Sequence, residues 1–130
     1  MSRGLLDTSV FIAREQQRSL GPLPDELAVS VITIGELELG VLAAGDPEQL
    51  ARRADTLALA RAADPIAVTE ATMSAFARLT HDCRTSGAWP KILDALIAAT
   101  AVEHGLPVVT QDDDFAAMAR VHRRLVVQSV

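Results

Sequence analysis

The sequence contains one cysteine, one lysine and no long apolar run, which argues against internal disulfides and membrane spans. The lone cysteine, Cys83, cannot form an internal disulfide and suits a reducing compartment, so we expect a cytoplasmic protein. The longest apolar stretches, residues 27–34 and 92–102, are interrupted by polar side chains and are shorter than the roughly 18 residues that a membrane span needs. Asp7 interrupts the first apolar run, so neither a secretory signal nor a membrane segment is expected.

Lys91 is the only lysine among the 12 basic residues, and the others are arginines. Arginine presents a planar fork of donors, which favours recognition of phosphate and carboxylate groups. The formal net charge of −5 argues against a protein that binds nucleic acid through a uniformly positive surface. That argument weakens if several acids share one metal site.

The chain of 130 residues has the usual length of one domain, so we expect residues 1–130 to form a single unit. Hydrophobic residues make up 49% and charged residues 22%, which is ordinary for a globular protein and excludes disordered and fibrous classes.

Short apolar runs alternate with longer helical patterns along the whole chain. The runs predict strands at residues 3–6, 27–31, 66–68, 106–109 and 125–127. The patterns predict helices at residues 9–18, 33 to about 44, 46–63, 69–83, 91–104 and 112–119. This alternation predicts a three-layer α/β/α domain around a mainly parallel central sheet.

Acidic residues lie where this fold gathers ligands, at the carboxyl ends of the strands. Asp7 follows the first strand, and Asp112 and Asp114 follow the strand at residues 106–109. Glu36 and Asp94 lie in the first turns of two helices that begin near the same edge. We refer to the edge that carries these five residues as the acidic rim.

Structural interpretations compete for four of the five acids. Asp7 and Asp112 suit the N-caps of the helices that follow them. Thr33 and Glu36 have the spacing of a capping box. A run of three aspartates that includes Asp114 is common in solvated turns.

Asp94 is harder to explain structurally, because Leu93, Leu96 and Ile97 around it indicate burial. A buried carboxylate is costly without a partner, and a cation shared with the other rim acids would supply one. Ligands that are all oxygen select Mg²⁺ or Mn²⁺ over zinc. The histidines, His81, His104 and His122, have no metal-binding spacing, so we assign them structural roles.

Four motifs together resemble the PIN-domain ribonucleases and, within them, the VapC toxins of bacterial toxin–antitoxin pairs. They are Leu5-Leu6-Asp7-Thr8-Ser9-Val10, Ser30-Val31-Ile32-Thr33-Ile34-Gly35-Glu36-Leu37, Asp94-Ala95-Leu96-Ile97-Ala98-Ala99-Thr100-Ala101 and Val108-Val109-Thr110-Gln111-Asp112-Asp113-Asp114-Phe115. The resemblance implies a PIN fold and a Mg²⁺-dependent endoribonuclease. It assigns catalysis and metal binding to Asp7, Glu36, Asp94, Asp112 and Asp114, beside hydroxyls at Thr8 and Thr110. Leu93 departs from the family, where a polar residue is common.

The resemblance also implies partners: an RNA substrate such as tRNA or rRNA, a VapB-type antitoxin whose C-terminal tail covers the acidic pocket, and a second copy of the chain in a homodimer. Water is the expected nucleophile, because Ser9 and Cys83 have no base in an evident motif. Two alternatives remain open: a non-toxin PIN nuclease in RNA maturation, and an inactive PIN module that binds RNA.

Substrate contacts are assigned to basic residues near the strand ends or helix starts, namely Arg14, Arg18, Arg84 and Lys91. Trp89 has two interpretations, a base-stacking residue or a packing residue on its loop. The clustered carboxylates should repel one another when no metal is bound, so at least one should have a raised pKa.

Overall fold

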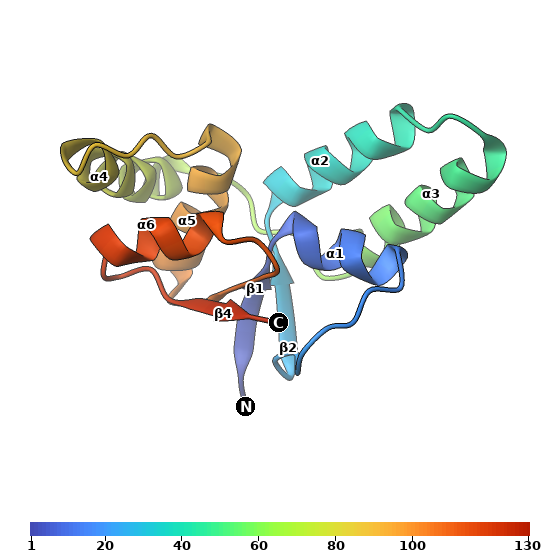
Figure 1. Cartoon of the computed structure of the whole chain (residues 1–130), viewed down its shortest axis with the longest axis horizontal. Helices are drawn as coiled ribbons and strands as arrows, with labels where there is room; N and C mark the ends of the chain where they lie inside the picture. The colour runs from blue at the N-terminus through green and yellow to red at the C-terminus, as the bar shows by residue number, and fades with distance from the viewer.

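Four short parallel strands form the centre of the molecule in the computed structural model, which describes all 130 residues (Figure 1). The strands are β1 (Arg3–Leu6), β2 (Glu26–Val29), β3 (Val108–Thr110) and β4 (Val127–Ser129). Their order in the sheet is β2-β1-β3-β4. β1 is therefore an inner strand, with Leu6 opposite Val29 on one side and Val109 on the other.

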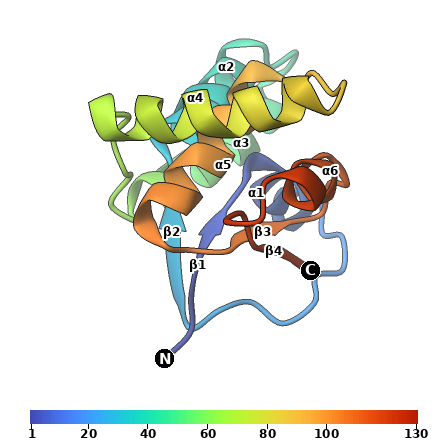
Figure 2. The same ribbon diagram turned by 90° about the vertical axis from the view of Figure 1, so that its left-hand side faces the viewer.

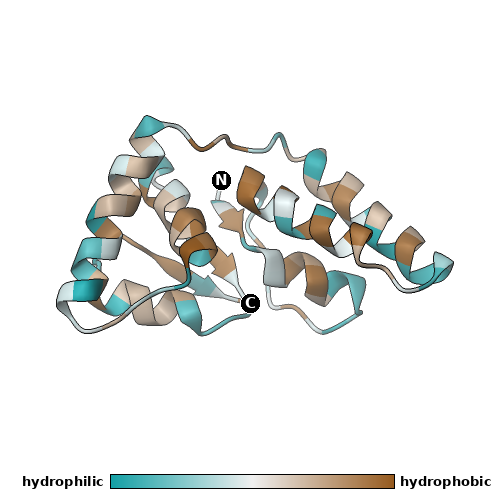
Figure 3. Cartoon of the chain, turned by 90° about the horizontal axis from the view of Figure 1, so that it is seen from above, coloured by the Kyte–Doolittle hydropathy of each residue, from teal (hydrophilic) through white to brown (hydrophobic).

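Helices cover both faces of this sheet, which confirms the predicted three-layer α/β/α fold (Figures 1 and 2). One layer holds α1 (Thr8–Glu15), α2 (Val31–Leu42) and α3 (Pro47–Arg61), and the other holds α4 (Glu70–Thr85), α5 (Ile92–His104) and α6 (Asp114–Val121). The helices carry polar residues among their apolar ones, as expected for helices with one buried side (Figure 3).

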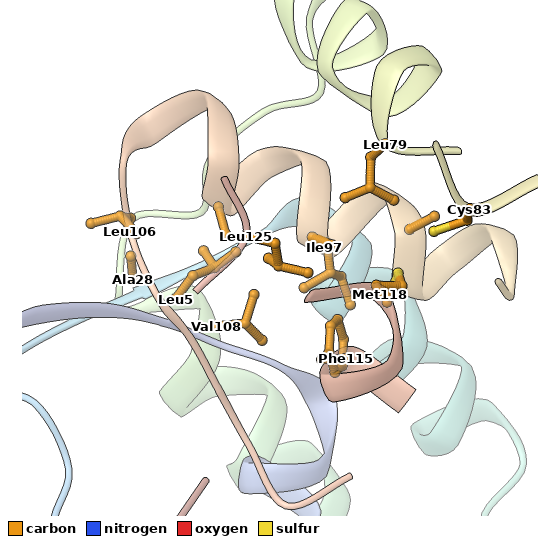
Figure 4. Packing of buried hydrophobic residues seen from close by; sticks show 13 residues of the cluster. Leu5, Ala28, Leu79, Cys83, Ile97, Leu106, Val108, Phe115, Met118 and Leu125 are labelled. Atoms are coloured by element: carbon orange, nitrogen blue, oxygen red, sulfur yellow. The ribbon is translucent and has the colours of Figure 1, made fainter. Parts of the chain in front are cut away.

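Successive strand residues point into different layers, as the two-residue period of a strand requires. Leu5 and Val108 belong to the core cluster beneath α4, α5 and α6, whereas Leu6 and Val109 belong to the cluster beneath α1, α2 and α3. Figure 4 shows the first cluster, in which Phe115 lies among side chains from the helices and strands of that layer. Both faces of the sheet are thus buried.

Several helix ends form for the local reasons that the sequence suggests. The carboxylate of Asp46 accepts a hydrogen bond from the backbone N–H of Gln49, and Pro47 occupies the first position of α3. Thr69 and Thr72 form a reciprocal capping box at the start of α4. Gly105 ends α5 with a φ of 64°, a left-handed conformation that glycine adopts without steric cost.

Other boundaries differ from the predictions. The expected strand at residues 66–68 is reduced to a single bridge between Ile66 and Ser30, and β4 lies two residues later than expected. The helix predicted at residues 9–18 ends at Glu15, and Gln17 then adopts a φ of 57°. These shifts follow from hydrogen-bond pairing with neighbouring strands and turns, which hydrophobic spacing alone does not specify.

The helices fall short of membrane spans: none combines the length and the apolar character needed to cross a bilayer. Cys83 is a free thiol buried in the core.

Candidate active site

The acidic rim forms where β1 and β3 end side by side. The backbone N–H of Asp7 donates to the carbonyl of Val109 at 3.1 Å, so the residues that follow the two strands are neighbours. Asp112 lies beyond β3, and Asp114 is the first residue of α6. Glu36 comes from α2 in one layer and Asp94 from α5 in the other.

Asp7 is the most deeply buried acid of the rim, with 2% of its surface exposed. Burial raises its pKa from 3.8 to about 6. The hydroxyls of Ser9 and Thr110 lower this pKa, and the nearby charge of Asp112 raises it further. Asp7 occupies the N-cap position of α1 but makes no side-chain capping bond there, so capping does not account for this aspartate.

Ser9 has a positioning role that the sequence analysis did not assign. Its hydroxyl donates to Asp7 Oδ1 at 2.7 Å, accepts from the backbone N–H of Gln111 at 3.0 Å, and lies 3.3 Å from the hydroxyl of Thr110. The Thr110 hydroxyl in turn accepts from the backbone N–H of Asp112 at 2.9 Å. This network ties the end of β1 to the end of β3. The Asp-Thr-Ser run was its only local signal.

Glu36 is held by a neighbouring helix. The Thr8 hydroxyl donates to Glu36 Oε1 at 2.7 Å and lies 3.2 Å from the hydroxyl of Thr33. The proposed capping box of Thr33 and Glu36 is wrong, because α2 begins two residues earlier and Ser30 caps it by accepting from the backbone N–H of Ile32. Glu36 is therefore free of a capping role.

Asp94 is half-buried, which corrects the expectation of a fully enclosed carboxylate. The first turn of α5 is open to solvent, with Ile92 64% and Leu93 46% exposed, and full burial begins at Ala95. Burial still raises the pKa of Asp94 to about 6, with further increases from the charges of Asp114, Glu36 and Asp112. The charge of Lys91 lowers this pKa.

All five predicted acids thus lie at one edge of the sheet, and charge interactions link them. The charge of Asp112 raises the pKa of both Asp7 and Asp94. The charges of Glu36 and Asp114 also raise the pKa of Asp94. At least one carboxyl pKa was predicted to be raised, and two are; burial is the larger cause at both positions, and the predicted repulsion between the acids adds to it. No three acidic, histidine or cysteine side chains are close enough to hold an ion by themselves.

The donor chemistry nevertheless fits a hard divalent cation. Every group of the rim that can act as a ligand is an oxygen, and no histidine is among the groups that shift the pKa of Asp7 or Asp94. Mg²⁺ keeps several water ligands and commonly needs only one or two direct carboxylates. A rim of separated carboxylates satisfies that requirement without a closed cage.

A pocket flanks the rim on each side. The first, about 220 Å³, is lined by Trp89, Lys91, Asp94 and Asp114, and Lys91 Nζ lies 3.6 Å from Asp114 Oδ2. The second, about 390 Å³, runs between α1 and α2 and includes Glu36. Acids of the rim therefore line two separate pockets.

The residues predicted to contact the substrate lie in different parts of the structure. Lys91 lines the first pocket, and Arg84 stacks on Trp89, a residue of that lining. Arg14 lies in the last turn of α1 and lines a separate apolar pocket with Leu23 and Leu59, so the structure gives it no place at the rim. Arg18 lines neither of the two pockets at the rim.

His122 has the structural role assigned to the histidines. It is only 6% exposed, and its Nδ1 lies 2.7 Å from Asp82 Oδ2, an interaction between the C-terminal end of α6 and α4.

Comparison with known proteins assigns the family. The model of the PIN domain matches residues 4–121. Ribonuclease VapC8 of Mycobacterium tuberculosis H37Rv is 61% identical over 100 residues, covering 75% of this chain and 89% of the relative. Ribonuclease VapC4 of the same strain is 47% identical over 124 residues, covering 92% and 93% of the two chains.

Among solved structures, VapBC-5 from Mycobacterium tuberculosis, described as a member of the VapBC family of toxin–antitoxin systems, matches with a TM-score of 0.85 and 38% identity. The match covers 100% of this chain and 98% of the other. The acidic rim, the parallel sheet and these matches agree, and the chain belongs to the PIN-domain family, in its VapC group.

Proposed function

We propose that this protein is an endoribonuclease that acts as the toxin of a VapBC-type toxin–antitoxin pair. The observation that carries the proposal is the set of five carboxylates gathered at one sheet edge, in a chain 61% identical to a ribonuclease of the VapC group. A retained acidic rim favours an active nuclease over an inactive binding module.

The proposed cofactor is Mg²⁺, with Mn²⁺ as a substitute. It would be held by Asp7, Asp94 and Asp112, with water bridging to the carboxylates that the ion does not contact directly, and Glu36 and Asp114 would contribute directly or through water. A bound divalent ion would neutralise charge on the phosphodiester and lower the pKa of an attacking water. The raised pKa of Asp7 and of Asp94 supports this assignment, because burial and neighbouring acids disfavour both negative charges and a bound cation would offset that cost.

Neither Ser9, which lies beside the rim acids, nor Cys83 serves as the nucleophile that attacks the RNA. Ser9 is engaged by Asp7 and by the backbone of Gln111, and no lysine or histidine is bonded to it to act as a base. Cys83 is 1% exposed, and burial raises the pKa of its thiol, so it stays protonated. Water is therefore the nucleophile in this proposal.

The proposed partner is a VapB-type antitoxin, as in the VapBC-5 toxin–antitoxin system that the chain resembles. Leu39 and Leu42 on α2 are 67% and 79% exposed, which leaves apolar surface close to Glu36 for a partner to cover. The free, buried thiol of Cys83 suits the reducing cytoplasm, where tRNA and rRNA occur. The homodimer stays a prediction.

The test is cleavage of tRNA and rRNA by the purified protein, in Mg²⁺ and in EDTA. We expect cleavage in Mg²⁺ or Mn²⁺, none in EDTA, and a loss of at least about a hundredfold in Asp94→Asn, as expected when a metal ligand is removed. Asp113→Asn is the matched control, because Asp113 is exposed, adjoins two rim acids and makes no capping bond. Cleavage that persists in EDTA, or an inert wild type, would overturn the proposal.

A further inference from the structure

Trp89 lies in the loop between α4 and α5 and is 72% exposed. The interpretation of this residue as a packing residue is therefore wrong. The loop backbone is nevertheless restrained, because the backbone N–H of Ala88 donates to the carbonyl of Cys83 at 2.9 Å and Pro90 restricts the backbone after the indole. A large aromatic ring thus lies mostly in solvent on a restrained backbone, where it stabilises little of the fold.

Arg84, in the last turn of α4, approaches the indole. Its guanidinium carbon lies 4.4 Å from the centre of a Trp89 ring, which is a cation–π contact. The contact places a positive charge beside an exposed aromatic surface. Proteins that bind single-stranded nucleic acid use this combination, with aromatic rings that stack on the bases and cations that attract the phosphates.

The indole also adjoins the acidic rim. The same pocket of about 220 Å³ is lined by Trp89 and Lys91 and by two of the rim acids, Asp94 and Asp114. Pockets that enclose a whole small ligand usually measure roughly 300–1,000 Å³, so this one suits a single flat group inserted from a longer chain. Lys91 and Asp114 are 79% and 54% exposed, and such a surface ion pair is weak enough to exchange for a phosphate.

We propose that Trp89 is a base-stacking residue of the RNA-binding surface: one unpaired base next to the cleaved bond stacks on the indole, while Arg84 and Lys91 contact the flanking phosphates. The inference rests on the proposed ribonuclease function and adds a substrate class to it, an RNA segment with an unpaired base. Stacking favours any base, so this contact selects unpaired structure rather than a sequence.

The sequence supplies a direct probe of this contact. Trp89 is the only tryptophan and the chain has no tyrosine, so its emission reports on this position alone. We would titrate the inactive Asp7→Asn variant, in Mg²⁺, with a single-stranded RNA decamer and with a decamer of the same length whose central nucleotides are abasic. We expect the first RNA to quench the indole emission by about half or more, and the abasic RNA to quench it by less than a fifth of that.

Affinities measured by anisotropy of labelled RNA separate the roles of the two groups. Trp89→Ala should weaken binding about tenfold or more, which is the size of one lost base–aromatic stack, and Trp89→Phe should stay within about threefold of the parent. Arg84→Gln should weaken binding of both RNAs. Arg52→Gln is the matched control, because Arg52 is an exposed arginine on α3, in the other layer, paired with Glu48.

The outcomes distinguish this inference from the proposed function. RNA that binds by anisotropy without changing the emission, equal quenching by the abasic RNA, or an unchanged affinity in Trp89→Ala would overturn the stacking role. A protein partner that quenches the emission where RNA does not would overturn it too. Failure of the ribonuclease itself is seen separately, as an absence of Mg²⁺-dependent cleavage by the wild type. With active enzyme, Trp89→Ala should raise KM and leave kcat within about threefold.

Discussion

The hydroxyl of Thr8, the first residue of α1, donates a hydrogen bond of 2.7 Å to Glu36 Oε1 on α2. The two residues are 28 positions apart, and the bond holds the carboxylate at the rim without a metal ion. A hydroxyl that orients a ligand acts on function more than on stability.

Thr8→Val keeps the shape of the side chain and removes this donor. We expect RNA cleavage to fall by about 10–100-fold, because Glu36 loses the group that orients it. The melting temperature should change by only a few degrees. The control is Thr56→Val, since the buried Thr56 hydroxyl donates to the carbonyl of Arg52 within α3, away from the rim. An equal loss of activity in both variants would argue against an orienting role.

Asp7→Asn should stabilise the metal-free protein at neutral pH. The pKa of Asp7 is raised from 3.8 to about 6 in the folded state, so the folded protein binds more protons between these values. The contribution of Asp7 to the free energy of unfolding is therefore fully present below pH 3.8 and is lost as the pH rises through about 6. Removing the charge should recover on the order of 1–3 kcal/mol at pH 7.5, and little near pH 4.

Urea unfolding in EDTA at these two pH values measures the difference. Asparagine retains the oxygen that accepts the Ser9 hydroxyl bond, so that contact is preserved. A marked loss of stability at pH 7.5 would restore the interpretation of Asp7 as a helix-capping residue.

Mg²⁺ uptake should weaken in acid. Asp7 and Asp94 both have a pKa of about 6, and protons compete with the cation for these carboxylates. Calorimetry should give a Kd at pH 5 at least about tenfold higher than at pH 7.5, and Asp94→Asn should abolish uptake. A pH-independent Kd, or a Mn²⁺-soaked crystal without an anomalous peak among the rim carboxylates, would contradict the assigned ligands.

Induced alone in a bacterial host, the wild-type gene should arrest growth, and Asp7→Asn should not. Co-expression of the cognate antitoxin should restore growth, and the two proteins should co-purify. An arginine of the antitoxin is the simplest blocking group, because it can bind carboxylates bidentately where the cation would lie. Harmless expression of folded, metal-binding wild type would favour the RNA-maturation alternative.

The exposed leucines of α2 offer a check on the antitoxin surface. Leu39→Arg with Leu42→Arg should leave RNA cleavage intact and reduce co-purification, because both side chains are largely exposed and lie outside the rim. Unchanged co-purification would place the antitoxin on another surface.

The sequence by itself determined the layers of this protein and the identity of its acids. Alternation of apolar runs with helical spacing is a local property, and it predicted a parallel sheet covered on both faces. Asp7 and Asp112 follow strands directly, so a parallel sheet brings them to one edge whatever the details of packing. Helix ends with strong local signals, such as Asp46-Pro47 and Gly105, were predicted for the same reason.

Only the tertiary structure decided how the acids are held and how much water reaches them. The Ser9–Thr110 contact joins residues 101 positions apart, and no local pattern encodes it. The exposure of Leu93 depends on which surfaces the other elements leave uncovered, so its apolar character alone wrongly indicated burial around Asp94. Raised pKa values at Asp7 and Asp94 likewise arise from burial and neighbouring charges, which exist only once the chain is folded.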